Sequence, residues 1–394
     1  MFQDSSLTSF DRNRQTVACF GKEQLRDRIK HSSKLIASVK ADRTNLLQSC
    51  FNSEIIMEAL KITAVLVLSY ICFSSSMNIC PDHCTCYFSR NVTSVICVSI
   101  ESLHEVPQNI PSTATSISLE FTNVTSLKEN DLAGLFELQE LHLSSNKLKN
   151  ISSGALKELH QLRTLDLTNN LLNTLPPGLF NTCLILTTLA LQGNKLQAVD
   201  PFWFQHLRSL QSLDLSNNML KSLPLNSFQN LTELVTLDLS SNKIENLPVI
   251  LFHKLSKLER LNLANNQLYN IPPGTFDQVL NLEFLFLNGN KIRAIPVGLF
   301  NKLLKLDTMD LSENSLETLP AGVFDNLQHI GAKWQQGLDL SLNPWDCSCG
   351  LKHLWYWIAT NSDKLYSRST TICATPETAS GKQIGTMSEL EFKC

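Results

Sequence analysis

One hydrophobic phrase, repeated every 24 residues, constrains the fold of this 394-residue chain more than any other feature. The phrase reads Leu138-x-x-Leu141-x-Leu143-x-x-Asn146 and recurs with unchanged spacing. Its asparagine returns at Asn170, Asn194, Asn218, Asn242, Asn266, Asn290 and Asn314. A phenylalanine recurs in phase with it, at Phe180, Phe204, Phe228, Phe252, Phe276, Phe300 and Phe324. Two registers in phase over so many copies indicate that one structural unit is repeated along the chain.

The pattern predicts a stack of short parallel strands. Leu-x-Leu has the two-residue period of a strand, which places both leucines on one face. A single unit cannot bury that face alone, so successive turns have to stack into a solenoid with one parallel sheet. A degenerate copy at 117–122 and a last copy at 338–343, which follows a five-residue insertion, bring the array to about ten repeats. We expect the asparagines to satisfy buried backbone groups at each turn and the phenylalanines to form a spine on the opposite side.

Two groups of four cysteines flank the array and predict a disulfide-bonded cap at each end. Cys80, Cys84, Cys86 and Cys97 precede the repeats, and Cys347, Cys349, Cys373 and Cys394 follow them. Each group of four allows three pairings. Zinc ligation involving His83 or His353 is the alternative, and disulfides are favoured because a secretory signal precedes the first group. Apolar residues at helical spacing over 351–358 predict a short capping helix.

The segment before the first cysteines predicts export from the cell. A short charged start, an apolar run and three serines describe a secretory signal peptide. A membrane anchor is the alternative, but the run is shorter than the roughly 20 residues that span a bilayer. The expected organisation is 1–56 as an over-extended gene model or disordered leader, 57–76 as signal peptide, 77–110 as N-terminal cap, 111–343 as repeats and 344–394 as C-terminal cap. The mature chain is therefore expected to be secreted, in the extracellular space, without a membrane span.

Charge and side-chain chemistry argue against several classes of function. Lys and Arg number 33 against 36 Asp and Glu, so no basic surplus exists to neutralise the phosphates of a nucleic acid. No nucleophile–base pair and no cofactor motif can be placed, which predicts a protein that is not an enzyme and needs no cofactor. Asp214 and Asp238 should be neighbours on the sheet, which would raise one pKa or bind a cation. Carboxylates exposed on a solvated sheet favour a structural or recognition role instead.

The repeat at 284–287 carries the candidate binding site. Leu285 and Leu287 take the inward positions, so Phe284 and Phe286 must point outward from the concave face of the sheet. The other repeats have polar or small residues in these two columns, and adjacent exposed aromatics ringed by polar groups are typical of a binding hot spot. Packing with neighbouring side chains, or mere tolerance, is the alternative. The predicted protein-binding residues are Phe284, Phe286, Arg260, Asn262, Thr308 and Asp310.

Four sequons and Cys183, a cysteine within the repeats, are the remaining candidate sites. Predicted glycosylation sites are Asn91, Asn123, Asn150 and Asn230. None of them falls in a concave column of the repeat, so glycans there would shield the outside and leave the inner sheet free. Cys183 replaces the buried leucine of other repeats and is interpreted as an inert core thiol, with an intermolecular disulfide as the alternative.

Residues 77–394 resemble the secreted leucine-rich repeat family with N- and C-terminal cysteine caps. The resemblance rests on Leu141-His-Leu-Ser-Ser-Asn146, on Leu175-Pro-Pro-Gly-Leu-Phe180 and on the lengthened last repeat with Gly337-Leu-Asp-Leu-Ser and Asn343-Pro-Trp345. It implies an α/β solenoid, a leucine-rich repeat horseshoe with a parallel concave sheet and disulfide-capped ends. The pairing that it implies is Cys80 with Cys86, Cys84 with Cys97, Cys347 with Cys373 and Cys349 with Cys394.

The same resemblance carries the functional expectation. It implies a plasma glycoprotein that binds other proteins on its concave face and modulates transforming growth factor beta signalling, through the growth factor's receptors or co-receptors. Two rivals remain: a non-catalytic carrier subunit of a plasma carboxypeptidase, and an innate recognition protein for microbial surfaces.

Overall fold

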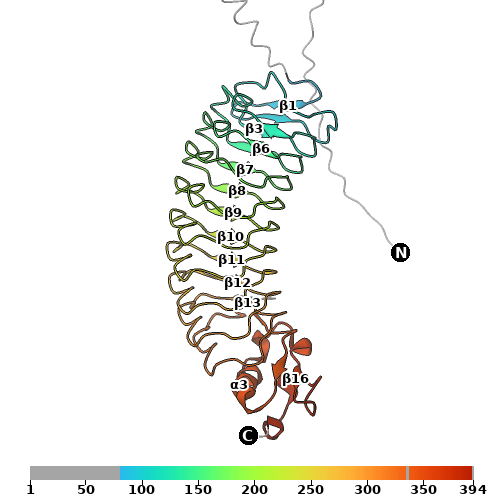
Figure 1. Cartoon of the computed structure of the whole chain (residues 1–394), viewed down its shortest axis with the longest axis vertical. Helices are drawn as coiled ribbons and strands as arrows, with labels where there is room; N and C mark the ends of the chain where they lie inside the picture. The colour runs from blue at the N-terminus through green and yellow to red at the C-terminus, as the bar shows by residue number, and fades with distance from the viewer. Residues whose placement is uncertain (1–79, 334–336, 393–394) are drawn as a thin grey trace, which may run out of the picture. The chain divides into compact units, whose positions relative to one another are not determined.

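The described part of the chain is a solenoid whose turns each contribute one short strand to a shared sheet (Figure 1). The computed structural model describes residues 80–333 and 337–392. The predicted signal peptide at 57–76, the segment 1–56 and Cys394 lie outside these residues. Within the described ranges, no helix combines the length and the apolar character that crossing a bilayer requires.

The main sheet has twelve strands. It begins with an antiparallel pair, β1 (Thr85–Phe88) and β2 (Thr93–Ile96), and every later pairing is parallel. The following strands are β3 (Ser116–Ser118), β5 (Glu140–His142), β7 (Thr164–Asp166), β8 (Thr188–Ala190), β9 (Ser212–Asp214), β10 (Thr236–Asp238), β11 (Arg260–Asn262), β12 (Phe284–Phe286), β13 (Thr308–Asp310) and β14 (Leu338–Asp339). Leu237 pairs with Leu213 on one side and Leu261 on the other, a step of one 24-residue repeat. The predicted parallel solenoid is confirmed.

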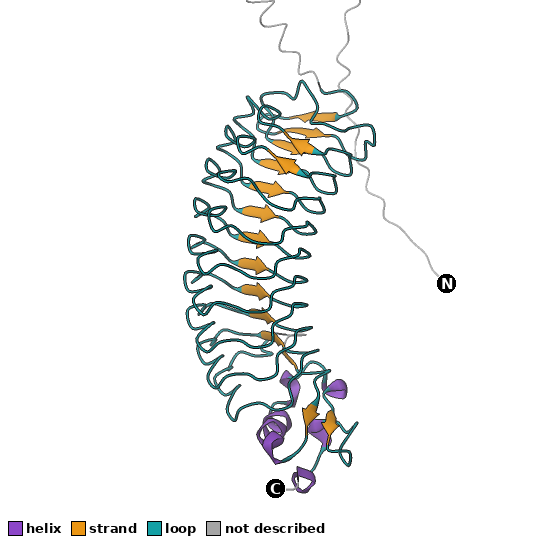
Figure 2. Cartoon of the chain, in the orientation of Figure 1, coloured by secondary structure: helices purple, strands orange, loops and turns teal. Residues whose placement is uncertain are grey.

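Smaller elements accompany this sheet. Two further parallel pairs are β4 (Ser126–Leu127) with β6 (Asn150–Ile151), and β15 (Trp345–Asp346) with β16 (Cys373–Thr375). The connections between repeats are turns, as the Pro- and Gly-containing phrases require, and the α-helix of the described part, α3 (Lys352–Thr360), lies beyond the repeats (Figure 2). Short 3-10 helices surround it: η1 (Cys349–Leu351), η2 (Ser362–Lys364), η3 (Arg368–Thr370), η4 (Ile384–Thr386) and η5 (Glu389–Phe392).

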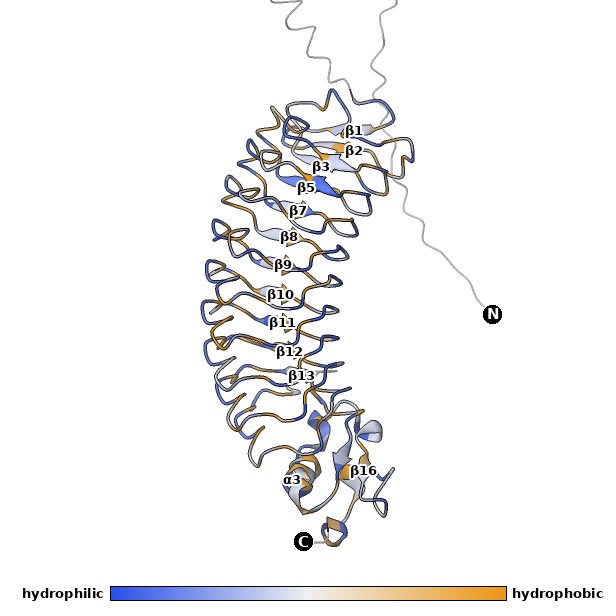
Figure 3. Ribbon diagram, viewed as in Figure 1, coloured by the Kyte–Doolittle hydropathy of each residue, from blue (hydrophilic) through white to orange (hydrophobic). Residues whose placement is uncertain are grey.

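The core is built from the same positions of every repeat, and hydrophobic residues recur in each turn along the stack (Figure 3). The middle residue of each three-residue repeat strand, such as Leu213 or Leu237, is at most 1% exposed. The predicted phenylalanine spine is present, with Phe252, Phe276 and Phe300 stacked at centroid distances of 6.4 and 6.3 Å. Stacking of this kind adds about 0.5–1.5 kcal/mol per pair beyond area burial, which ties neighbouring turns together.

A ladder of buried asparagines satisfies the backbone where each turn leaves the sheet. The Nδ2 of Asn242 donates to the carbonyls of Leu215, Leu239 and Ser240 at 2.9, 3.1 and 3.1 Å. Its Oδ1 accepts the N–H of Leu220 at 3.0 Å. One amide therefore satisfies backbone groups of its own turn and of the preceding one, because an unpaired buried backbone group would be costly. The predicted role of the repeated asparagine is confirmed.

Disulfides close both ends of the array. The described pairs are Cys80–Cys86, Cys84–Cys97 and Cys347–Cys373, and they coincide with the pairing that the family resemblance implies. Cys349 is also disulfide-bonded, while its expected partner Cys394 lies outside the described residues. A search of the described residues finds no group of His, Cys, Asp or Glu arranged to hold a metal ion, so no zinc cluster is described at His83 or His353.

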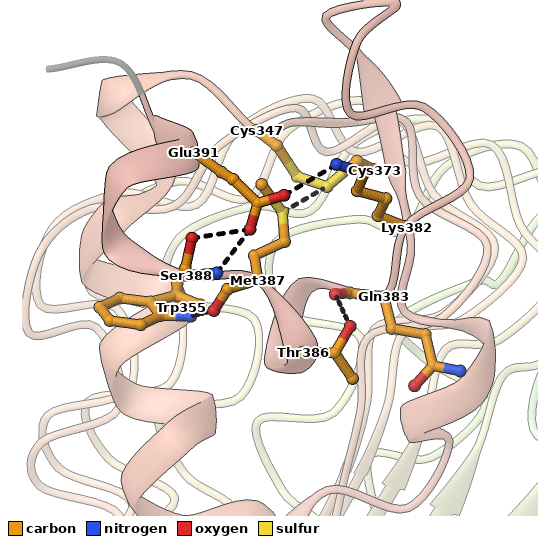
Figure 4. A network of polar contacts seen from close by, with 9 residues as sticks. All are labelled: Cys347, Trp355, Cys373, Lys382, Gln383, Thr386, Met387, Ser388 and Glu391. Carbon is orange, nitrogen blue, oxygen red and sulfur yellow. Dashed lines mark hydrogen bonds and ion pairs between the residues drawn. A yellow bond between two sulfur atoms is a disulfide. The ribbon is translucent and has the colours of Figure 1, made fainter.

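Figure 4 shows how the C-terminal cap is held together around one of these disulfides. The thioether of Met387 lies 3.2 Å from the sulfur of Cys373, and the indole of Trp355 donates to the Met387 carbonyl at 2.8 Å. Glu391 pairs with Lys382 at 2.7 Å and accepts the N–H of Ser388. The Lys382 ammonium and the Ser388 donors lower the pKa of Glu391 to about 2. This cap covers the open end that a solenoid would otherwise expose.

Candidate protein-binding face

The outward side of the main sheet, here called the sheet face, carries the first and third side chains of each strand. In β9, β10, β12 and β13 these side chains are half-buried, and the middle residue is fully buried. The alternation follows from the two-residue period of a strand, which separates a core side from a solvent side. The sheet face is therefore a surface of stacked, regularly spaced side chains.

The structure places the predicted aromatic pair toward the C-terminal end of this surface, on the third strand from the end of the sheet. Phe284 and Phe286 are the first and third residues of β12, and both are half-buried. On one side Phe284 pairs with Arg260 and Phe286 with Asn262; on the other they pair with Thr308 and Asp310. All six predicted site residues are thus brought together on three adjacent strands. We call Phe284 and Phe286 the aromatic patch.

Arg260 lies against both rings of the aromatic patch. Its guanidinium carbon is 5.4 Å from the centroid of Phe284 and 4.5 Å from that of Phe286. A guanidinium over an aromatic face is attracted by the ring quadrupole, by about 0.5–1 kcal/mol at exposed sites. The two rings therefore pack against a neighbouring side chain while remaining partly exposed to solvent.

A second cation reaches the patch from the lengthened last repeat. The ammonium of Lys333 lies 5.7 Å from the centroid of Phe284, and it pairs with Glu283 at 2.9 Å and with Asp307 at 3.8 Å. Asp307 is almost fully buried, and its Oδ1 accepts the N–H groups of Ala332 and Lys333. The sequence did not predict Lys333, Glu283 or Asp307 as site residues. The sequence feature that could have pointed to them is the five-residue insertion before the last copy.

A column of aspartates runs along the rest of the sheet face. Asp214 and Asp238 are register neighbours, as predicted. The Oδ1 of each accepts the N–H two residues further on, that of Ser216 or Ser240, at 2.8 Å. The amide of Asn262 donates to Asp238 Oδ2 at 2.8 Å. The carboxylates are therefore held by their own turns.

Burial and like charge change how these carboxyls titrate. Burial raises the pKa of Asp214, and the neighbouring carboxylates of Asp238 and Asp166 raise it further, against the lowering effect of the Ser216 donors. The pKa of Asp310 is raised by burial and then by Asp339 and Glu313, again against hydrogen bonds from its own turn. On the sheet face, Asp214 and Asp310 therefore ionise less readily than an exposed aspartate does.

The remaining predicted residues lie outside the strands of the main sheet. Among the sequons, Asn91 and Asn150 are exposed, whereas Asn123 and Asn230 are half-buried; none belongs to a strand of the main sheet. Cys183 is a free thiol with no exposed surface, and burial raises its pKa to about 12. A protonated thiol that is shielded from solvent is consistent with the interpretation of Cys183 as an inert core residue.

Comparison with known proteins identifies the repeat. The family model described as Leucine rich repeat matches residues 112–183, 185–244, 232–292 and 281–331. Leucine-rich repeat-containing protein 3 of Danio rerio is 34% identical over 116 residues, which are 29% of this chain and 43% of the relative. A phospholipase A2 inhibitor of Gloydius brevicaudus siniticus is 44% identical over 94 residues, 24% of this chain and 27% of the relative. The matches thus span less than half the length of either relative.

A solved structure has the same fold. A chain of the octameric complex of Latrophilin 3, Unc5D and FLRT2 (LRR) aligns with a TM-score of 0.63 and 27% identity, covering 79% of this chain and 98% of that one. The repeat register, the asparagine ladder and the family match lead to one conclusion. The chain belongs to the leucine-rich repeat family.

Proposed function

We propose that this chain is a secreted glycoprotein that binds another protein on its sheet face, with the aromatic patch as the anchor. The observation that supports the proposal is the pair of phenylalanines, Phe284 and Phe286, set side by side on an outward strand with Arg260 against both rings. Aromatic residues, phenylalanine among them, and arginine are enriched at protein–protein interfaces. Leucine-rich repeat proteins are generally non-catalytic scaffolds that mediate protein–protein interaction, and disulfides at both ends are consistent with an extracellular setting.

The partner that the family resemblance implies is a receptor or co-receptor of transforming growth factor beta. The lengthened last repeat, with Gly337-Leu-Asp-Leu-Ser and Asn343-Pro-Trp345, resembles that of leucine-rich alpha-2-glycoprotein, a plasma protein of this family. A carrier role for a plasma carboxypeptidase and the recognition of microbial surfaces are the competing outcomes. Co-purifying carboxypeptidase activity would reveal the first, and binding to glycan or lipid instead of protein would reveal the second.

A second partner class is favoured by the comparisons. Two snake proteins named as phospholipase A2 inhibitors are 44% and 41% identical to this chain over 94 and 92 residues. A secreted phospholipase A2 is therefore the alternative occupant of the same face. In that case the chain would act by covering the enzyme and not by signalling.

The test compares both partner classes on one immobilised protein. The full chain and a Phe284→Ser/Phe286→Ser variant are presented to receptor ectodomains of transforming growth factor beta and to a secreted phospholipase A2. We expect one class to bind the wild type and to lose at least about tenfold in affinity with the variant, since hot-spot truncations cost about 2 kcal/mol or more. Binding to the receptor ectodomains or to the phospholipase A2 then identifies which class of partner the chain has.

The matched control is a Phe202→Ser/Val297→Ser variant. Phe202 and Val297 are exposed apolar residues outside the sheet, 64% and 80% accessible, so the variant loses similar apolar surface. It should bind like the wild type. If the Phe284→Ser/Phe286→Ser variant also binds like the wild type, the aromatic patch is not the anchor.

A further inference from the structure

A stripe of cations lies on the loops that follow the sheet strands. Figure 2 shows these loops along one flank of the solenoid. The residue after the ladder asparagine is a lysine in every second turn: Lys147, Lys195, Lys243 and Lys291. All four side chains are exposed. Two positions further on, Lys149, Lys221 and Arg293 are exposed as well. We call these seven residues the basic stripe.

The solenoid holds the stripe in a fixed register. The N–H of Lys195, Lys243 and Lys291 each donates at 2.8 Å to a carbonyl of the preceding turn, those of Leu172, Leu220 and Leu268. Adjacent strands in a sheet lie about 4.8 Å apart, so lysines in every second turn are spaced by about 10 Å. The four lysines therefore form a line of regularly spaced charges about 30 Å long.

The two columns of the stripe from 147 to 293 hold one carboxylate, Glu245, and it forms no ion pair with the stripe. Across the described residues, none of the seven cations belongs to an ion pair, whereas lysines elsewhere do, for example Lys157 with Glu129 and Lys257 with Glu233. The ammonium of Lys291 donates a hydrogen bond to the neutral amide of Gln267, at 3.3 Å. A line of unpaired cations on a chain of net charge −3 concentrates positive potential along this flank.

We propose that the basic stripe binds a linear sulfated polysaccharide of the glycosaminoglycan class. Regularly spaced lysine ammonium groups match a polymer whose sulfates recur at regular intervals, and each lysine acts as a point charge toward one anionic group. Clusters of lysine and arginine are the recognised footprint of such polyanions. This binding is separate from the proposed protein-binding role of the sheet face.

A single polyanion chain fits the surroundings of the stripe better than the other anionic partners. A flat anionic membrane would bring its charge close to the aspartate column of the sheet face as well, where Asp214 and Asp238 would be repelled. Single-stranded nucleic acid needs aromatic platforms for its bases, and the two columns of the stripe from 147 to 293 hold a single aromatic residue, Tyr269. A narrow polysaccharide contacts the stripe and avoids both conflicts.

The test measures the affinity of the full chain for a heparin decasaccharide over a range of salt concentrations. The variant is Lys195→Ser/Lys243→Ser/Lys291→Ser, in turns away from the sequon at Asn150. Its affinity at physiological salt should fall on the order of tenfold to a hundredfold. The slope of log K against log salt should become shallower by about two, since each lost contact removes roughly 0.7–0.9. The Phe284→Ser/Phe286→Ser variant should bind the decasaccharide like the wild type.

The matched control is Lys157→Ser/Lys257→Ser/Lys305→Ser. It also removes three positive charges, but from the connecting side of the repeats. Equal losses for the two triple variants would overturn the proposal, because only net charge would then matter. Desulfated heparin that binds as tightly as heparin would also overturn it. So would stripe-dependent binding of oligo-thymidine or of phosphatidylserine vesicles that matches or exceeds the binding of heparin.

Discussion

The guanidinium of Arg260 lies 4.5 Å from the ring centroid of Phe286, and it also reaches the ring of Phe284. The three side chains come from two neighbouring strands of the sheet, so their spacing is set by the strand register. The cation–π contacts of Arg260 favour this arrangement of the two rings. A surface that is already arranged in this way lowers the entropy that binding has to overcome.

Replacing Arg260 by alanine should loosen this patch without unfolding the repeats. The loss of two exposed cation–π contacts costs about 1 kcal/mol, which corresponds to a fall of roughly 2–4 °C in the midpoint of thermal unfolding. Affinity for the protein partner should fall as well, because the rings are no longer held. Arg260→Lys is the control, since it keeps the charge and loses the planar group. If Arg260→Lys binds the partner as weakly as Arg260→Ala, the planar guanidinium is what matters. If Arg260→Ala binds like the wild type, Arg260 does not hold the aromatic patch for binding.

The repeat could be predicted from sequence because each position returns to the same environment every 24 residues. Burial of Leu213 and Leu237, the ladder role of Asn242 and the phenylalanine spine all follow from that period. The neighbours of Phe284 and Phe286 followed from the same register.

Contacts outside the period could not be predicted. Lys333 contacts Phe284 and Glu283, and its N–H donates to Asp307; no position of the regular repeat encodes these contacts. The antiparallel pairing of β1 with β2 likewise depends on a cap whose spacing occurs once in the chain. The strand register places Arg260 beside Phe284, but it does not determine how far the Arg260 side chain extends across the two rings.

Removing one rung of the asparagine ladder should be strongly destabilising. Asn242→Ala leaves the carbonyls of Leu215, Leu239 and Ser240 without the amide and the N–H of Leu220 without an acceptor. Each buried polar group left unsatisfied costs about 1–3 kcal/mol, so we expect a loss of at least about 3 kcal/mol in the free energy of unfolding. Denaturant unfolding followed by circular dichroism measures it. Asn246→Ala, at an exposed asparagine of the same turn, should be near neutral, and similar effects for the two variants would refute the ladder's role.

The thiol of Cys183 should be inert in the folded protein. Burial raises its pKa to about 12, so the reactive thiolate is scarce at neutral pH, and the sulfur is shielded from solvent. A thiol-specific reagent, with labelled sites located by peptide mass spectrometry, should modify Cys183 only after denaturant is added. Labelling under native conditions, or a dimer that dissolves on reduction of a bond at Cys183, would contradict the assignment.

The raised pKa of Asp214 predicts a pH dependence opposite to that of an ordinary ion-paired aspartate. Burial, followed by Asp238 and Asp166, makes the folded state hold the proton more tightly than the unfolded state does. The folded state is therefore favoured while Asp214 is protonated, and this stability is lost as the pH rises from the ordinary value through the raised pKa. Asp214→Asn keeps an oxygen for the N–H of Ser216 and removes the charge. It should raise the unfolding midpoint at about pH 7 and change it little at about pH 3.

Asp363→Asn, in the C-terminal cap, is the matched control for charge removal because its side chain is exposed. It should leave the unfolding midpoint nearly unchanged at both pH values, since an exposed carboxylate gains little or nothing on protonation. The decisive comparison is the difference between neutral and acidic midpoints for the two variants. A stabilisation by Asp214→Asn that is equal at both pH values would mean that the side chain acts through packing, and the charge repulsion along the aspartate column would then be too weak to affect folding.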